Sequence, residues 1–203
     1  MAPAPRDAPA AAERPVIPAD TALLIIDVQQ GMDAPFLPER NNPGAERQMT
    51  ALLGAWRTAG APVIHVQHLS VISDSPLRPG QPGVELKPEV RPLAGEPLFQ
   101  KRVNSAFIGT ALEGYLREHG IGQLVIVGLT TDHCVSSTAR MAANLGFSVT
   151  VVSDATATFG RTGPDGRYYG PEEIHRAELA ILHGEFAAVR STESVLAGAA
   201  PIR

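Results

Sequence analysis

Three side chains in this 203-residue sequence have the types that nucleophilic catalysis needs: an aspartate, a lysine and the chain's single cysteine. Asp27 directly follows the apolar run over residues 22–26, and Lys101 follows Leu-Phe-Gln. Cys134 follows the apolar run over residues 124–127 through a short turn. A thiolate is a strong nucleophile, a nearby ammonium favours it over the thiol, and a carboxylate can accept and return a proton. The three residues therefore make a complete acid, base and nucleophile set.

The segments around these residues alternate between short apolar runs and helical patterns. Continuous runs rich in Val, Ile and Leu predict buried strands over residues 22–26, 62–67, 124–127 and 148–152, with weaker ones over 97–100 and 186–189. Helical patterns over 45–59, 110–119 and 132–145 each end at a glycine suited to the position after a helix, and Pro171 opens another helix. This alternation predicts βαβ units, and hence a three-layer α/β domain with a mostly parallel sheet.

The three candidate residues fall where such a fold binds ligands. Open parallel sheets bind ligands outside the carboxyl ends of their strands. Cys134 also lies near the predicted start of a helix capped by Thr131 or Asp132, where unpaired N–H groups lower a thiol pKa. Taken singly, each residue has an ordinary interpretation: a capping acid, a solvated lysine and an inert core thiol. Their joint placement at three strand ends favours the catalytic interpretation.

The histidines offer rival sites that their spacing disfavours. His133 adjoins Cys134, but consecutive helix residues point about 100° apart, so a Cys–His pair is not expected. His65 and His68 lie three apart, on and just after one predicted strand. In extended chain such residues project to opposite faces, and no acidic ligand lies between them. We therefore predict no metal site and no cofactor, and we interpret both histidines as core or pocket-rim residues.

Composition narrows the class of protein. With 44% hydrophobic residues, the chain suits one domain over residues 16–203, preceded by a flexible Ala- and Pro-rich arm over residues 1–15. A net charge of −4 with interspersed signs disfavours nucleic-acid binding. No apolar stretch approaches the roughly 20 residues of a membrane span. A lone cysteine and the lack of a secretory apolar region fit a reducing cytoplasm.

Two predicted connections are long enough to suggest function. Residues 69–96 contain five prolines, and residues 159–170 form the second long connection. Because loops of this length without their own structure are uncommon in compact domains, we interpret the first as a functional loop or lid.

The segments around the three candidate residues resemble the isochorismatase-like cysteine hydrolases. This superfamily includes nicotinamidases, N-carbamoylsarcosine amidohydrolases and ureidoacrylate hydrolases. The similar segments are LLIIDVQ at 23–29, Lys101 with NSAF at 104–107, and VGLTTDHCV at 127–135, and the likeness spans residues 20 to 195. The resemblance implies a six-stranded sheet, an Asp27, Lys101 and Cys134 triad, a cis peptide between Leu129 and Thr130, and an oxyanion hole from the N–H groups of Thr130 and Cys134.

The same resemblance implies an activity with open alternatives. It implies hydrolysis of an amide or ureido C–N bond in a small molecule through a thioester. Isochorismatases proper lack a cysteine at the nucleophile position, so Cys134 disfavours that activity. Nicotinamidases usually carry an Asp-x-His metal motif after the second strand, where this chain has His65-Val66-Gln67-His68. Nicotinamidase-type deamidation remains an alternative, and so does a non-catalytic domain that binds a ligand or partner.

Position along the chain also suggests which residues line the pocket and which form contacts between subunits. The expected pocket residues are Gln29, Phe36, Asn104, Phe107 and Tyr168 or Tyr169. Homo-oligomers, dimers or tetramers, are usual in the superfamily. The largely apolar stretch over residues 195–202 is a candidate interface.

Overall fold

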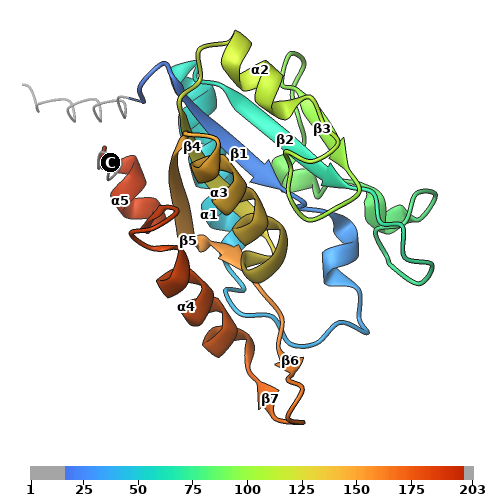
Figure 1. Cartoon of the computed structure of the whole chain (residues 1–203). Coiled ribbons are helices and arrows are strands. Elements are labelled where there is room, and N and C mark those ends of the chain that lie inside the picture. Colours follow the sequence, from blue (N-terminus) through green and yellow to red (C-terminus); the bar gives the residue numbers. More distant parts are fainter. Residues whose placement is uncertain (1–16, 199–203) are drawn as a thin grey trace, which may run out of the picture.

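The computed structural model describes residues 17–198 (Figure 1). The predicted arm over residues 1–15 and the last residues of the predicted interface stretch 195–202 lie outside this range. Six parallel strands form one sheet in the order β3-β2-β1-β4-β5-β8. The strands are β1 (Thr21–Ile26), β2 (Val63–His68), β3 (Leu98–Lys101), β4 (Gln123–Leu129), β5 (Ser148–Ala157) and β8 (Ala188–Arg190). The predicted parallel α/β sheet is confirmed.

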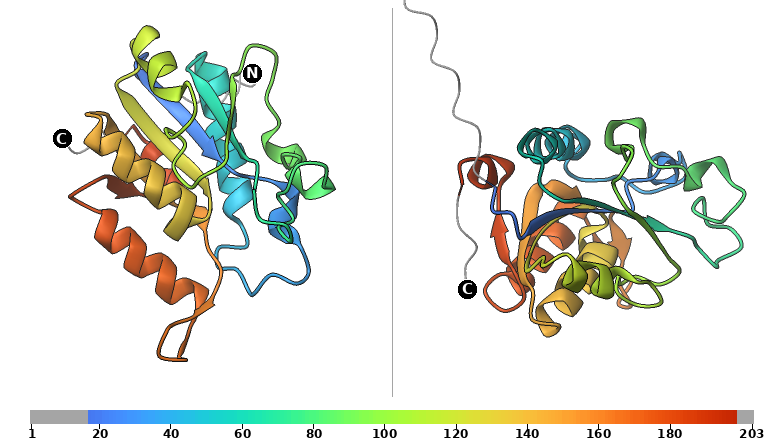
Figure 2. Two further views of the ribbon diagram at one scale, coloured as in Figure 1. Left: turned by 45° about the vertical axis from the view of Figure 1, so that its right-hand side comes forward. Right: turned by 90° about the horizontal axis from the view of Figure 1, so that it is seen from above.

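Helices cover both faces of this sheet (Figure 2). One face packs against α1 (Ala45–Ala59) and α5 (Thr192–Leu196), and the other against α2 (Leu112–Glu118), α3 (Ser136–Asn144) and α4 (Pro171–Leu182). Every residue of β1 is buried because its alternate side chains enter the two apolar clusters on opposite faces. None of the helices in residues 17–198 combines the length and apolar character that crossing a membrane requires.

The segment that carries Cys134 differs from the predicted helix over residues 132–145. It begins with a single π-helical turn, η4 (Thr131–Val135), and only then becomes α3. Neither proposed cap acts as one, because the Thr131 hydroxyl contacts His175 and the Asp132 carboxylate binds Thr158 and Arg161. The prediction of a side-chain cap was wrong, since these side chains tie the turn to neighbouring elements instead.

The predicted loop over residues 69–96 is anchored along its second half, which includes the short 3-10 turns η2 (Pro82–Val84) and η3 (Pro88–Val90). The Val84 carbonyl accepts hydrogen bonds from the Gln29 and Gln67 side chains at 2.8 and 2.9 Å. The Lys87 N–H donates to the Val28 carbonyl at 2.9 Å. This half of the loop therefore lies fixed beside the carboxyl ends of β1 and β2 (Figure 1).

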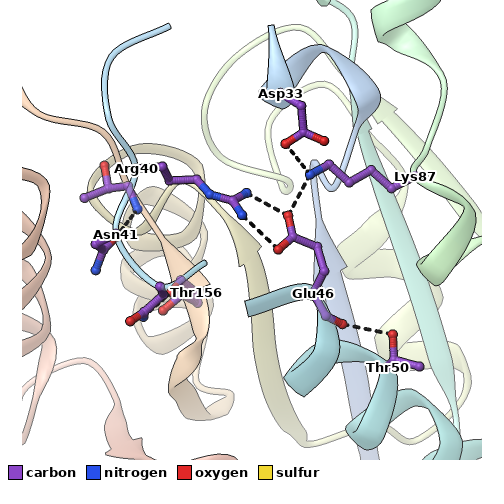
Figure 3. Close-up of polar contacts among 9 residues, drawn as sticks. Asp33, Arg40, Asn41, Glu46, Thr50, Lys87 and Thr156 are labelled. Atoms are coloured by element: carbon purple, nitrogen blue, oxygen red, sulfur yellow. Dashed lines mark hydrogen bonds and ion pairs between the residues drawn. The ribbon is translucent and has the colours of Figure 1, made fainter. Parts of the chain in front are cut away.

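An ion-pair network completes the anchoring (Figure 3). The Lys87 ammonium lies 2.6 Å from the Glu46 carboxylate at the start of α1 and 2.7 Å from that of Asp33 in η1 (Gln30–Asp33). Arg40 donates two parallel hydrogen bonds to Glu46, at 2.7 and 2.9 Å. Although burial opposes it, these hydrogen bonds and charges lower the pKa of Glu46 to about 2. The network joins the long loop to α1.

Glu46→Gln is expected to lower the free energy of unfolding by roughly 3 kcal/mol at neutral pH, because Lys87 and Arg40 lose a mostly buried anionic partner. The folded-state pKa of about 2 lies below the ordinary 4.5. The contribution of Glu46 is therefore complete above about pH 4.5 and is lost as the pH falls toward 2. Urea denaturation at a series of pH values measures both effects. Glu113→Gln is the control, because Glu113 forms an exposed pair with Arg117, and its expected change in the free energy of unfolding is below about 1 kcal/mol. Equal losses of stability in the two variants would contradict a stabilising role for the Glu46 network.

Candidate active site

Four adjacent strands each deliver a polar side chain to one edge of the sheet. Lys101 is the last residue of β3 and His68 the last of β2, while Asp27 follows β1 and Cys134 follows β4 after the turn at Thr130. The chain runs outward from β1 through β2 and β3 and returns to β4 on the other side of β1. The strand order therefore reverses between β1 and β4, which is where open α/β sheets bind ligands.

Lys101 lies at the centre of this group. Its Nζ is 2.5 Å from Asp27 Oδ2, 3.2 Å from Cys134 Sγ and 3.2 Å from His68 Nδ1. The side chains of Lys101 and Asp27 are completely buried, and Cys134 is 8% exposed. The three residues singled out from the sequence thus lie in direct contact, and an ammonium paired with a carboxylate is brought against the thiol.

Burial controls the protonation of the group. Desolvation raises the pKa of Asp27, and the Lys101 charge opposes this only in part. For Cys134, desolvation and the Asp27 carboxylate outweigh Lys101 and raise the pKa to about 12. The predicted lowering of the thiol pKa was therefore wrong for the resting site, because the loss of hydration exceeds the effect of one ammonium. Cys134 rests as a thiol, and its proton has to leave during any attack.

The Asp27 carboxylate has a free oxygen that could receive that proton. Oδ2 is held by Lys101, whereas Oδ1 is buried and has no hydrogen-bond partner among residues 17–198.

The close approach of β4 to β1 sets the distance between the strand ends that carry Cys134 and Asp27. Gly128 has φ +126, and a Cβ on it would lie 2.1 Å from the Ile26 carbonyl, so only glycine fits beside the end of β1.

The turn that carries Cys134 is held by neighbouring elements. The peptide bond between Leu129 and Thr130 is cis. The hydroxyl of Thr131 is 2.9 Å from Nδ1 of His175, a buried residue of α4. The Asp132 carboxylate accepts a hydrogen bond from Nε of Arg161 at 2.8 Å. Both contacts fix the turn relative to the sheet, and burial keeps the pKa of His175 below its ordinary value.

A cavity of about 280 Å³ opens onto this group. Its polar end is formed by Asp27, His68, Thr130 and Cys134, with Asn104 and Arg161 nearby. Residues 70–77 of the long loop form one wall. The apolar lining residues are Met32, Leu37, Ile72, Pro76, Leu77 and Phe159. The arrangement suits a small substrate whose reactive carbonyl lies at Cys134 while its remainder contacts an apolar wall.

Of the predicted pocket residues, Asn104 lines the cavity and the others lie elsewhere. Gln29 is fully buried, and its amide binds the backbone of His68 and Val84, so it clamps the long loop. Phe107 belongs to the apolar core, where its ring stacks on Phe147 at 5.9 Å. Both residues follow the right strands, but their side chains are used for packing and anchoring.

The last two predicted pocket residues, Phe36 and Tyr168, lie outside the cavity because their side chains are exposed on the surface. Phe36 is 68% exposed, and the next residue, Leu37, lines the cavity in its place. Tyr168 is 54% exposed and sits with Tyr169 on β7 (Tyr168–Tyr169), which pairs with β6 (Arg161–Thr162) in a hairpin that projects beyond α4 (Figure 1). The second long connection thus reaches the cavity through Phe159 and Arg161, near its start.

Two histidines line the cavity: His68, which we interpret from the sequence as a core or pocket-rim residue, and His133, which the sequence does not assign to the pocket. His68 touches Lys101, and His133 lies at the cavity with half of its side chain exposed. The strand-end rule that selects Asp27 also selects His68, because it directly follows the predicted strand over residues 62–67. The pocket-rim interpretation of His68 agrees with its position at the cavity, but its contact with Lys101 is not predicted from the sequence. His65 in fact lies apart and binds Glu96 at 2.9 Å.

The donor atoms of Asp27, His68 and Cys134 lie within 4.8 Å of one another, a spacing that could hold a metal ion. The Lys101 ammonium, however, is in contact with all three. A metal ion among the same atoms would be adjacent to this buried positive charge. The residues therefore do not fit a resident metal while Lys101 is charged in this position.

Comparison with known proteins agrees with this fold. The isochorismatase domain model matches residues 21–194. The isochorismatase family protein YrdC of Bacillus subtilis is 44% identical over 175 residues, covering 86% of this chain and 94% of the relative. A crystal structure of an isochorismatase-family hydrolase from Chromobacterium violaceum is 45% identical with a TM-score of 0.86, covering 90% and 95% of the two chains.

Two relatives with named activities are more distant. The ureidoacrylate amidohydrolase RutB of Caulobacter segnis is 29% identical over 213 residues, covering 88% of this chain and 85% of the relative. Nicotinamidase 3 of Arabidopsis thaliana is 29% identical over 182 residues, covering 82% of each. The matches extend over nearly all of the described residues. This chain therefore belongs to the isochorismatase family of hydrolases.

Proposed function

We propose that the protein is a cysteine amidohydrolase that cleaves an amide or ureido C–N bond of a small molecule through a thioester. The observation that carries this proposal is the contact of the Lys101 ammonium with both Asp27 and Cys134 at the end of the cavity. Two relatives whose names denote amide hydrolysis support the bond type. A single buried cysteine suits a reducing compartment, so we place the activity in the cytoplasm.

The first half of the reaction forms the thioester. The substrate carbonyl binds at Cys134, and Asp27 accepts the thiol proton as sulfur attacks the carbonyl carbon. The carbonyl oxygen gains the negative charge, and the backbone N–H groups of Thr130 and Cys134 donate hydrogen bonds to it. Asp27 then gives its proton to the leaving nitrogen, the C–N bond breaks, and ammonia or an amine departs. Lys101 stays charged and balances whichever of Asp27 and Cys134 is ionised.

The second half releases the acid. A water molecule enters where the amine left, Asp27 removes one of its protons, and the resulting hydroxide attacks the thioester carbon. The C–S bond breaks, and sulfur regains a proton from Asp27. Asp27 begins and ends ionised, so these residues complete the cycle. The raised pKa of Asp27 suits this exchange, because a carboxyl group of ordinary acidity is a weak base at neutral pH.

Ammonia release from a panel of amides tests the proposal. The panel contains nicotinamide, N-carbamoyl amino acids, ureidoacrylate-like compounds and simple aliphatic and aromatic amides, each with Cys134→Ala as control. Release that requires Cys134 supports the amidohydrolase, and the best substrate distinguishes ureido hydrolysis from nicotinamidase-type deamidation. No release from any compound would favour the non-catalytic binding domain.

Asp27→Asn and Lys101→Met are expected to change the reactivity of Cys134 in opposite directions. The Asp27 carboxylate raises the pKa of the thiol and the Lys101 ammonium lowers it. At neutral pH, removing the carboxylate therefore increases the thiolate fraction, and removing the ammonium decreases it. Alkylation by iodoacetamide, followed by mass spectrometry, should be roughly 10- to 10³-fold faster in Asp27→Asn and slower in Lys101→Met.

Asp20→Asn is the matched control for this experiment, because Asp20 precedes the same strand that Asp27 follows. Its alkylation rate should equal that of the unmodified sequence. Asp27→Asn should nevertheless be inactive toward amides, because it cannot move the proton. If both site variants change the alkylation rate in the same direction, the charges of Asp27 and Lys101 do not act in opposite directions on the pKa of Cys134.

A further inference from the structure

His68 touches the site but has no part in the reaction described above. It ends β2 between the strands that carry Lys101 and Asp27, and it is the register partner of Lys101. Its partly buried ring lines the cavity, with Nδ1 at 3.2 Å from the Lys101 ammonium. The ring therefore contacts the lysine as well as the cavity.

The contacts of the ring fix its protonation. An ammonium can only donate, so Nδ1 has to accept the hydrogen bond from Lys101. A neutral imidazole carries one N–H, so when Nδ1 accepts, Nε2 carries the proton. Burial and the Lys101 charge lower the pKa of His68 to about 4. At neutral pH the imidazole is uncharged and acts toward Lys101 as an acceptor.

With His68 counted, the donors and acceptors around Lys101 match in number. An ammonium has three N–H donors. Asp27 Oδ2, Cys134 Sγ and His68 Nδ1 are three acceptors, contributed by residues at the ends of three different strands. Each acceptor limits where Nζ can lie, and together they hold a long, flexible side chain at one point.

We propose that His68 is a positioning residue, the third acceptor of a shell that holds the Lys101 ammonium against Asp27 and Cys134. The existence of the shell is independent of the reaction, whereas its effect on turnover rests on the proposed function. Carboxylate, imidazole and thiolate are also the ligands that zinc sites use. The Lys101 ammonium thus occupies the position that a metal ion would take among these three side chains. Removing the ammonium should leave the three side chains able to bind a metal ion.

Titration of Lys101→Ala with Co²⁺ tests the shell without any substrate. Cobalt bound to a thiolate gives a charge-transfer absorption that other ligands do not give. We expect this band in Lys101→Ala, saturating at one ion per chain, and no band in the unmodified protein. Lys101→Ala combined with His68→Leu should bind Co²⁺ at least about 10- to 100-fold more weakly. No band in Lys101→Ala, or equal affinity in the double variant, would overturn the proposal.

Steady-state kinetics with the best amide from the panel test the effect on turnover. The Oδ1 of asparagine can replace Nδ1 as the acceptor, whereas leucine has a similar size and no acceptor. We expect kcat to fall about 100-fold in His68→Leu with little change in KM, and to recover most of this loss in His68→Asn. His133→Leu, which changes the other cavity-lining histidine, should alter KM and leave kcat near its original value.

The two experiments separate the possible failures. If no amide is hydrolysed but the cobalt band depends on His68, the shell stands and the proposed function fails. If Lys101→Ala does not fold, the kinetic comparison decides alone: a lower kcat rescued by asparagine supports the proposal, and an effect on KM alone overturns it.

Discussion

Cys134→Ala is expected to lower kcat for amide hydrolysis by roughly 10⁴- to 10⁶-fold, because no other residue can form the thioester. Cys134 is the only cysteine in the sequence, and the hydroxyl group of Thr131, which begins the same turn, is already bonded to His175. The thiol is small and lies at the edge of a cavity, so its removal should leave the fold intact. Ammonia release gives the activity, and thermal unfolding gives the stability of the same sample.

Two controls make this result specific to the nucleophile. Cys134→Ser keeps a hydrogen-bonding group near Lys101 but has a much weaker nucleophile, so it should be almost as inactive as Cys134→Ala. Ser136→Ala, two residues along the same segment, removes a side chain that binds Glu178 instead of facing the cavity, and should retain activity. Retained turnover in Cys134→Ala would show that hydrolysis uses water directly and that the thiol only contributes to binding.

Lys101→Met is expected to cost the protein both activity and stability. Methionine has nearly the length of the lysine stem, so packing is largely preserved while the ammonium is lost. Asp27 is then a buried carboxylate without its partner, and removing one member of such a pair costs about 3–5 kcal/mol. Turnover should become undetectable, because nothing balances the ionised form of Asp27 or Cys134. Urea denaturation and ammonia release measure the two losses.

The double variant Asp27→Leu/Lys101→Met separates these two effects. Replacing both members of a buried pair with apolar residues is often neutral or stabilising. The double variant should therefore regain most of the stability lost in Lys101→Met and remain inactive. That outcome would show that the pair is kept for chemistry at the expense of the fold. If the double variant is even less stable than Lys101→Met, the pair contributes to folding directly.

The sequence predicts the fold well because a strand that is buried on both faces of a sheet is a continuous apolar run, which is easy to recognise. Strands β1 and β4 contain the continuous apolar runs 22–26 and 124–127, and α1 has the bounds predicted for the helix over residues 45–59. Asp27, Lys101 and Cys134 could be grouped for a related reason: side chains at the carboxyl ends of adjacent parallel strands meet at one edge. Rules that depend only on local pattern and sheet direction are sufficient for these features.

The failed predictions depend on contacts between distant segments. The raised pKa of Cys134 results from how deeply the site is buried, which local sequence does not determine. Gln29 follows the expected strand, but its side-chain amide donates a hydrogen bond to the carbonyl of Val84, which is distant in sequence. His68 meets Lys101 because β2 and β3 pair in a particular register. In each case the role of the side chain is set by residues that are close in space but distant in sequence.

The uneven anchoring of residues 69–96 has a consequence for how this protein could diversify. The half that forms the cavity wall, residues 70–77, comes before the half that is clamped by Val84, Lys87 and Glu96. Lengthening a loop between fixed ends costs little, because each doubling of loop length adds only about 0.6 kcal/mol of closure entropy. Pro76 and Leu77 pack closely against Gly31, whereas residues 71–74 are exposed. Insertions, deletions and substitutions near residues 71–75 can therefore remodel this wall without disturbing Lys101 and its acceptors. The cavity wall formed by residues 70–77 therefore lies in a different stretch of the chain from Lys101 and Cys134, and it is free to evolve at a different rate.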